Sequence, residues 1–218
     1  VFQKRWVLRL HIVPAFGRRR LDAIGPAEIE AYKARKLREG QAAKSVNNHL
    51  HVLRKLLNLA VEWGELSHAP RVKQLRVPHG DFQFLTFEET ERFLRAAAPE
   101  WKPFVTTALK TGLRVGELLA LRWEDVDLVA GRLVVRRTLW QDQEGTPKGG
   151  RIREVPLSDE AVATLQAHRH LRGPYVFCEP DGRRLNHNRV KQVVPRACAR
   201  AGLAKRLTTH DLRHTFAS

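Results

Sequence analysis

The chain has 218 residues, of which 43% are hydrophobic, and its 39 Lys and Arg outnumber 23 Asp and Glu to give a formal net charge of +16. This length allows one large domain or two modest ones, and the apolar content is sufficient for packed cores. No apolar run approaches the roughly 18 residues of a membrane-spanning helix, and two widely spaced cysteines argue against a disulfide framework.

The positive charge is unevenly distributed along the chain. Residues 1–80 contain 16 Lys and Arg against 6 Asp and Glu, whereas residues 81–218 contain 23 against 17. Such a balance favours a polyanionic partner, most often nucleic acid, although a merely basic soluble protein has the same composition. The N-terminus is too polar for a secretory signal, so we expect a cytoplasmic protein. The absence of any methionine indicates a fragment or a processed product.

Residues 1–66 are predicted to form a helical domain. Pro26 fits the first turn of a helix that runs to about Arg38 and ends at Gly40. A longer helix follows, because apolar residues recur every three or four positions as one stripe, at Val46, Leu50, Leu53, Leu57 and Ala60.

Three basic residues of the longer helix lie off its apolar stripe, namely Lys44, Arg54 and Lys55. They form either a solvated basic face or a set of contacts to DNA phosphates. The stretch that follows, 67–83, combines Pro, Gly and charge without a period and is interpreted as a linker between two domains.

Residues 84–218 are predicted to form a second domain that mixes helices with a few strands. Thr86 and Glu89 fit a capping box at the start of a helix ending near Ala98. Further helices are expected from Pro103 to Gly112, over 117–121, after Ser158, over 186–202 with a kink at Pro195, and after Thr208 or Thr209. Strands are expected at 132–139, 151–157 and 175–178.

Two segments almost a hundred residues apart each place an arginine beside the start of a helix. Arg114 follows one predicted helix end, and Glu117 can hold its guanidinium; the alternative is an ordinary surface ion pair. His210 and Arg213 share one helical face, where an imidazole can relay protons and a guanidinium can bind phosphate oxygens. The alternative for His210 is a capping or core histidine.

Two further groups of residues have side chains suited to chemistry. Lys148 lies in a glycine-flanked loop between the two predicted strands and can reach a ligand, although most loop lysines only face solvent. Glu124, Asp125 and Asp127 suggest a metal-dependent nuclease whose activity EDTA would abolish, but a solvated turn is the simpler interpretation. We expect no metal ion and no other cofactor, because no His and Cys pattern has zinc spacing and no phosphate-binding loop is present.

Taken together, three motifs resemble those of the tyrosine recombinase (phage integrase) family. They are Thr111-Gly-Leu-Arg-Val-Gly-Glu-Leu-Leu-Ala-Leu-Arg-Trp123, Lys148-Gly-Gly-Arg-Ile-Arg-Glu-Val-Pro-Leu157 and His210-Asp-Leu-Arg-His-Thr-Phe-Ala-Ser218. The resemblance implies a mostly α fold with a small antiparallel sheet. It also implies a helical core-binding domain at 1–66, a linker at 67–83 and an α+β catalytic domain at 84–218 that lacks its C-terminal part.

The resemblance also implies roles for individual residues. Arg114 and Arg213 match the two catalytic arginines, His210 a general acid or base, and Lys148 the hairpin lysine that protonates the leaving 5′-oxygen. In this family a tyrosine attacks the DNA phosphate and forms a 3′-phosphotyrosine without a metal or ATP. The partners implied are double-stranded DNA held in a clamp, a homotetramer on two DNA sites and accessory DNA-bending proteins.

The sequence departs from the family pattern at the nucleophile. The two tyrosines, Tyr32 and Tyr175, match no nucleophile motif, and the sequence stops five residues after Arg213. We therefore expect a site-specific recombinase fragment that binds DNA but does not itself form the covalent intermediate. The alternative function is a non-catalytic DNA-binding protein that kept the clamp without the nucleophile.

Overall fold

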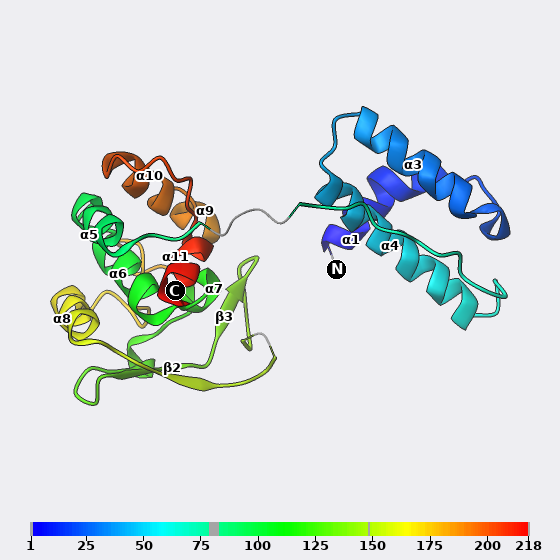
Figure 1. Cartoon of the computed structure of the whole chain (residues 1–218). Coiled ribbons are helices and arrows are strands. Elements are labelled where there is room, and N and C mark those ends of the chain that lie inside the picture. The colour runs from blue at the N-terminus through cyan, green and yellow to red at the C-terminus, as the bar shows by residue number, and fades with distance from the viewer. Residues whose placement is uncertain (1, 79–82, 148, 218) are drawn as a thin grey trace. The chain divides into compact units, whose positions relative to one another are not determined.

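The computed structural model describes residues 2–78, 83–147 and 149–217. The chain divides into two compact units, Val1–Gly80 and Asp81–Ser218, which Figure 1 draws in blue to cyan and in green to red. The first unit is built from helices, and the second combines helices with short antiparallel strands. The predicted fold class, mostly α with a small antiparallel sheet, is therefore confirmed.

The first unit contains two long helices preceded by several short ones. The elements in chain order are α1 (Phe2–Val7), the π-helical turn η1 (Leu8–Ile12), α2 (Val13–Phe16), the 3₁₀ turn η2 (Leu21–Ala23), α3 (Pro26–Arg38) and α4 (Ala43–Glu62). Glu28 accepts a hydrogen bond from the Gly25 amide at 3.1 Å, which fixes the start of α3. The predicted apolar stripe of α4 is buried along its whole length, as the periodicity required.

The segment 67–78 packs against the first unit without forming a helix or strand. Asn47 holds the backbone of Leu75 from both sides, accepting from its amide at 2.8 Å and donating to its carbonyl at 2.9 Å. The Lys33 ammonium donates to the Lys73 carbonyl at 3.0 Å. Since Ala69, Val72 and Leu75 also contact the helical core, this part of the predicted linker belongs to the first unit.

The second unit begins with the helices α5 (Phe87–Ala96), α6 (Lys102–Thr111) and α7 (Val115–Leu119) and the 3₁₀ turn η3 (Trp123–Asp125). The strands β1 (Val126–Asp127), β2 (Arg132–Val135), β3 (Thr138–Trp140), β4 (Gln143–Gly145) and β5 (Arg153–Pro156) follow. The last helices are α8 (Asp159–His168), α9 (His187–Val190), α10 (Val193–Arg200) and α11 (Thr209–Ala217). The caps predicted at Thr86 and Ser158 are confirmed by hydrogen bonds from the Glu89 and Ala161 amides.

The strands form two small antiparallel sheets. Strands β1, β2 and β5 pair in that order, with Leu133 opposite Val155, whereas β3 pairs with β4 as a separate hairpin. The single strand predicted over 132–139 is therefore wrong: it is interrupted at 136–137, and Thr138 and Leu139 belong to β3 of the separate hairpin. The chain leaves the sheet at Arg136 and Arg137, because both guanidinium groups turn toward the buried Asp125 carboxylate at 3.2 Å and 2.6 Å.

Two other predicted elements need correction. Tyr175 and Cys178 form only isolated bridges, to Arg122 and Arg184, so 175–178 is not a strand. The helical stretch over 186–202 is interrupted between α9 and α10. Pro195 does not kink it, because this residue lies in the first turn of α10, where a backbone N–H has no helical partner to lose.

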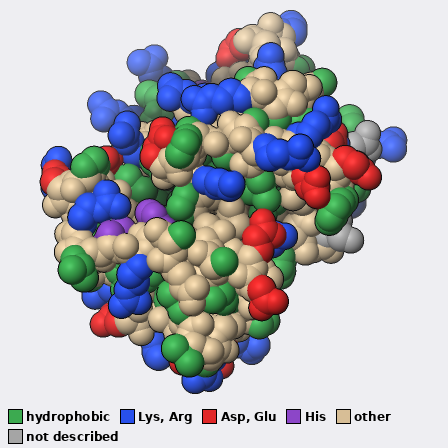
Figure 2. Space-filling view, turned by 90° about the vertical axis from the view of Figure 1, so that its left-hand side faces the viewer, with side chains coloured by type: hydrophobic (Ala, Val, Ile, Leu, Met, Phe, Trp, Pro, Cys, Tyr) green, Lys and Arg blue, Asp and Glu red, His purple; other side chains and the backbone are tan. Residues whose placement is uncertain are grey.

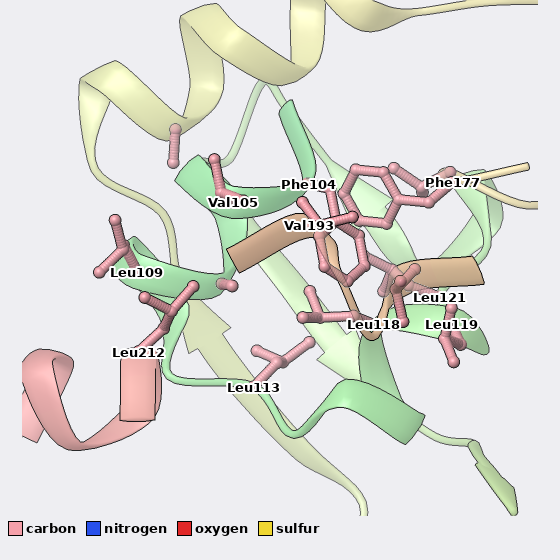
Figure 3. Packing of buried hydrophobic residues seen from close by; sticks show 14 of the residues in the cluster. Phe104, Val105, Leu109, Leu113, Leu118, Leu119, Leu121, Phe177, Val193 and Leu212 are labelled. Carbon is pink, nitrogen blue, oxygen red and sulfur yellow. The ribbon is translucent and has the colours of Figure 1, made fainter. Parts of the chain in front are cut away.

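A single hydrophobic core holds the helices of the second unit together. Figure 3 shows Phe104 of α6 next to Phe177, with Leu118 of α7 close to them, and Leu109 of α6 next to Leu212 of α11. Leu113 and Leu212 point into the same cluster. Each is the direct neighbour of a predicted catalytic arginine, so burial of the leucine fixes where the arginine emerges.

Candidate active site

The first arginine emerges from a sharp corner between α6 and α7. Gly112 ends α6 in the left-handed conformation at φ 59°, and its amide donates to the Ala108 carbonyl at 3.1 Å. Buried Leu113 follows, and Arg114 stands directly before α7. The Arg114 amide donates to Glu117 at 2.8 Å, so the helix start itself is fixed by that carboxylate.

Glu117 is the buried centre of the site. Its carboxylate, in a side chain that is 1% exposed, accepts from Arg114 Nη1 at 3.1 Å. It also accepts from Arg153 Nη1 at 3.0 Å and from Arg153 Nη2 at 2.7 Å. Burial alone would raise the pKa of Glu117, but the hydrogen bonds from Arg153 and Arg114 outweigh it and leave the pKa below its usual value. Glu117 is therefore ionised.

The second arginine reaches the same corner from α11. This helix packs on α6, and Arg213 Nη1 donates to the Gly112 carbonyl at 2.5 Å. Burial and the neighbouring charges of Arg114 and Arg153 lower the pKa of Arg213 from its usual value. Arg114 and Arg213, 99 positions apart in sequence, therefore belong to one electropositive cluster with Arg153 and Glu117.

His210 lies in the first turn of α11, one turn before Arg213. The side chain is exposed, and its ring centroid is 4.9 Å from that of His214 in an edge-to-face contact. Thr208 fixes the start of the helix, since its amide and hydroxyl both donate to Asp211 at 2.7 Å. The helix therefore presents a solvent-accessible imidazole on the side of the arginine.

Lys148, the remaining predicted catalytic residue, lies outside the described residues. The preceding hairpin of β3 and β4 packs directly on α7, and a Cβ at Gly116 would collide with the Leu139 backbone and the Thr138 hydroxyl. Glu144 of β4 accepts from Arg122 at 3.1 Å and from the Tyr175 hydroxyl at 3.0 Å. The hairpin of β3 and β4 is thus attached to α7, the helix that directly follows Arg114.

The residues predicted to contact DNA lie on α4 of the first unit and are all exposed. Lys44 and Lys55 are eleven positions apart, so they share the helix face opposite the buried stripe. Arg54 lies to one side of that face and contacts His51 at 3.3 Å. Their environment is a polar surface that is free to contact a ligand.

The acidic residues considered for a metal are engaged with other groups. Glu124 and Asp125 pair with Arg137 at 2.5 Å and 2.6 Å. Asp127 accepts from the amides of Val129 and Ala130 at 3.1 Å and 2.9 Å. These contacts are those of a capped turn and an ion-pair network, which disfavours the nuclease interpretation.

The hydroxyl of each tyrosine contacts a side chain of its own unit. Tyr32 is buried in the first unit, where its hydroxyl contacts His49 Nδ1 at 2.9 Å, and burial raises its pKa to about 12. The Tyr175 hydroxyl donates to Glu144 and its ring lies under the Arg122 guanidinium. Both therefore have structural roles.

Sequence reasoning missed Arg153. It lies within one of the three motifs, but nothing in the spacing indicated that this side chain reaches back across 36 positions to Glu117. In β5, Val155 is buried in the core. Side chains two positions apart in a strand lie on the same face, so an exact strand assignment for 153–156 would have predicted that Arg153 faces the core side as well.

The surface of the protein is rich in basic side chains. On the face shown in Figure 2, Lys and Arg gather in several groups, with Asp and Glu side chains among them. Among the described residues, no helix has the length and apolar character needed to cross a membrane.

The chain is similar to known proteins over most of its length. Residues 83–218 match the phage integrase family. The chain is 30% identical over 173 residues to the ICEBs1 integrase of Bacillus subtilis, covering 75% of this chain and 47% of that protein. It is 28% identical over 216 residues to the tyrosine recombinase XerC of Xanthomonas axonopodis pv. citri, covering 90% and 68%. The chain thus spans about half the length of the ICEBs1 integrase.

Solved structures show the same fold. The Tn1549 transposon integrase in complex with transposon right end DNA superposes with a TM-score of 0.85 at 19% identity, covering 98% of this chain and 78% of that one. A lambda integrase dimer bound to a COC′ core site gives a TM-score of 0.77 at 22% identity, covering 99% and 80%. Since the family match extends over more than half of the sequence, the chain belongs to the phage integrase family of tyrosine recombinases.

Proposed function

We propose that this chain is the DNA-binding and phosphate-binding part of a site-specific recombinase that cleaves and rejoins DNA strands. The observation that carries the proposal is the cluster in which Arg114 and Arg153 pair with the buried carboxylate of Glu117, while Arg213 binds the neighbouring Gly112 carbonyl. Three guanidinium groups and one carboxylate leave a surplus of positive charge at a half-exposed site. A phosphodiester supplies the matching negative charge.

Each residue has a role that suits phosphoryl transfer. Arg114 and Arg213 bind the non-bridging oxygens and stabilise the charge that develops on them in the transition state. His210 is exposed and exchanges protons with the reacting oxygens. Lys148 is assigned, by the family resemblance, to protonate the leaving 5′-oxygen. Tyr32 and Tyr175 are not assigned the role of nucleophile, because each hydroxyl is engaged by another side chain.

The first unit contributes side-chain contacts to the phosphate backbone of duplex DNA. Lys44 and Lys55 on α4, with Arg54 beside them, form the basic face of that helix. Lysines on an exposed helix face bind phosphates without reading sequence. By analogy with the lambda integrase tetramer bound to a Holliday junction, the working assembly is a homotetramer on two DNA sites. Its accessory partners are DNA-bending proteins, and it acts in the cytoplasm.

The catalytic half of the proposal is tested with a longer protein that contains this sequence followed by a tyrosine-bearing segment. On a nicked duplex carrying its recombination site, we expect an SDS-stable protein–DNA adduct. Arg114→Ala removes a ligand of the transition state and abolishes the adduct, while duplex binding by gel shift changes little. Arg95→Ala, at a surface arginine paired with Glu91, is the control and keeps full activity.

Two outcomes separate the proposal from its alternative. Near-normal adduct formation by Arg114→Ala would remove this residue from the active site. Duplex binding with no adduct in any version would favour the non-catalytic DNA-binding protein instead.

A further inference from the structure

Arg153, rather than Arg114, is the principal partner of the buried carboxylate. Arg153 binds both oxygens of Glu117 through its two terminal nitrogens, at 3.0 Å and 2.7 Å. Arg114 contributes one guanidinium nitrogen at 3.1 Å and its backbone amide. The two-pronged contact is the stronger of the two, since its geometry matches a carboxylate fork to fork.

The division of contacts leaves Arg114 available to a ligand. Within the described part of the chain, Nε and Nη2 of Arg114 have no hydrogen-bond partner, and the side chain is 39% exposed. Both terminal nitrogens of Arg153 are occupied by Glu117. Arg153 therefore does not offer a free fork to a phosphate, whereas Arg114 does.

The two arginines are fixed by different parts of the fold. Arg153 lies on β5, where it pairs with Val135 of β2. Arg114 lies at the start of α7, after the Gly112 corner. Glu117 is therefore the bridge through which the sheet holds the helix start, and the side chain of Arg153 makes the contact on the sheet side.

We propose that Arg153 is a positioning residue that orients Arg114 toward a phosphate by holding Glu117. This inference rests on the proposed function, in which Arg114 binds the reacting phosphodiester. Without the fork of Arg153, Glu117 is free to rotate toward Arg114 and compete with the phosphate for its guanidinium. Orientation of a phosphate-binding group by a neighbour of this kind is a general requirement of precise sites.

The test compares Arg153→Lys with Arg132→Lys in this chain. Both keep the charge and lie on the same sheet, but Arg132 pairs with the exposed Glu154 at 3.2 Å and does not contact Glu117. The Arg114 Nε–H resonance is assigned by its disappearance in Arg114→Lys and is followed by ¹⁵N NMR. Inorganic phosphate is then titrated, and its Kd is read from that resonance.

We expect Arg153→Lys to broaden the Arg114 resonance without ligand and to raise the Kd for phosphate about tenfold, equivalent to ~1.4 kcal/mol. Arg132→Lys matches the parent chain in both measurements. An unchanged resonance and Kd in Arg153→Lys would overturn the inference. So would an equal change in Arg132→Lys, since that would indicate a general effect on the sheet.

Two controls keep the result interpretable. Far-UV circular dichroism and the melting temperature establish that Arg153→Lys is folded. If it unfolds, Arg153→Gln combined with Glu117→Gln removes the competing carboxylate together with Arg153. We then expect a phosphate Kd close to that of the parent chain, and a Kd raised about tenfold overturns the inference. Failure of the proposed function has a separate signature. The Arg114 resonance of the parent chain would not respond to phosphate, while the broadening without ligand would still report on Arg153.

Discussion

The individual side chains of the site are organised around an ionised carboxylate that is removed from water. Glu117 is 1% exposed and is compensated by the half-exposed Arg114 and Arg153. A buried charge is tolerated only when groups of opposite charge form hydrogen bonds with it, because removing an ion from water costs several kcal/mol. The same cluster thus contributes to folding and creates the positive field of the site.

Glu117→Gln is expected to lower the free energy of unfolding of the second unit by about 3 kcal/mol, because the arginines lose a charge partner at a buried position. Urea unfolding followed by circular dichroism measures the change. Glu154→Gln is the matched control, since this exposed carboxylate also pairs with an arginine of the same sheet, and it is expected to cost less than about 1 kcal/mol. Equal effects would show that burial of Glu117 is unimportant.

His49 makes the first unit sensitive to pH. Burial, with the nearby charges of His11 and Lys36, lowers the pKa of His49 from 6.5 to about 4. The unfolded chain therefore binds a proton more readily than the folded one in this window. The contribution of neutral His49 to the free energy of unfolding is expected to be fully present above pH 6.5 and to decrease as the pH falls toward 4.

Amide hydrogen exchange along α4 measures this dependence in the full chain. His49→Gln removes the titrating group and is expected to flatten the pH dependence, even though it alters the hydrogen bond to Tyr32. His51→Gln, at an exposed histidine of the same helix, should keep the slope of the parent chain. A slope unaffected by His49→Gln would contradict the assignment.

Among the helices and strands, the candidate site depends on one tight corner. Gly112 ends α6, leads the chain into Arg114 and supplies the carbonyl that Arg213 binds. A Cβ at this position would collide with the ring of Phe216 on α11. The corner therefore sets the approach of α11 to α6 as well as the direction of the chain.

Gly112→Ala is expected to destabilise the second unit more than Gly131→Ala. Both glycines have φ near 60°, so each substitution carries a similar backbone penalty of about 1 kcal/mol. A Cβ at Gly131 would meet only the Leu157 carbonyl, at 3.8 Å, whereas one at Gly112 displaces Phe216. Thermal melts of the two variants measure the difference. Equal melting temperatures would show that the Phe216 ring on α11 moves aside at little cost in free energy.

For the molecule in its entirety, the surplus of basic residues determines the electrostatic part of the proposed binding to DNA. The formal charge of +16 is shared by both units, with the denser charge on residues 1–80. Lysines and arginines that contact phosphates release condensed counterions, so affinity depends steeply on salt.

The affinity of the chain for a duplex oligonucleotide is expected to fall linearly on a log–log plot against salt concentration. Replacing Lys44 and Lys55 by Ala should reduce the slope by about one for each phosphate that the variant no longer neutralises. Fluorescence anisotropy at several salt concentrations gives both slopes. Lys102→Ala, at an exposed lysine of α6, tests whether removal of any lysine has the same effect. A flat salt response of the parent chain would contradict binding through phosphates.

The elements that could be predicted from the amino-acid sequence are those whose signals are local. Caps at Thr86 and Ser158, the stripe of α4 and the glycine end of α6 depend on hydrogen bonds and burial within a few residues, so they were predicted correctly. The motifs around Arg114 and Arg213 also identified the family, because their residue order is specific.

Which side chains meet across the fold depended instead on tertiary packing. The 132–139 strand breaks because Arg136 and Arg137 prefer the buried Asp125, a contact that no local pattern encodes. Arg153 reaches Glu117 only once β5 has paired with β2 beside α7. Ion pairs of this kind join segments far apart in sequence, and their formation depends on which charges the packed core leaves close together and shielded from water.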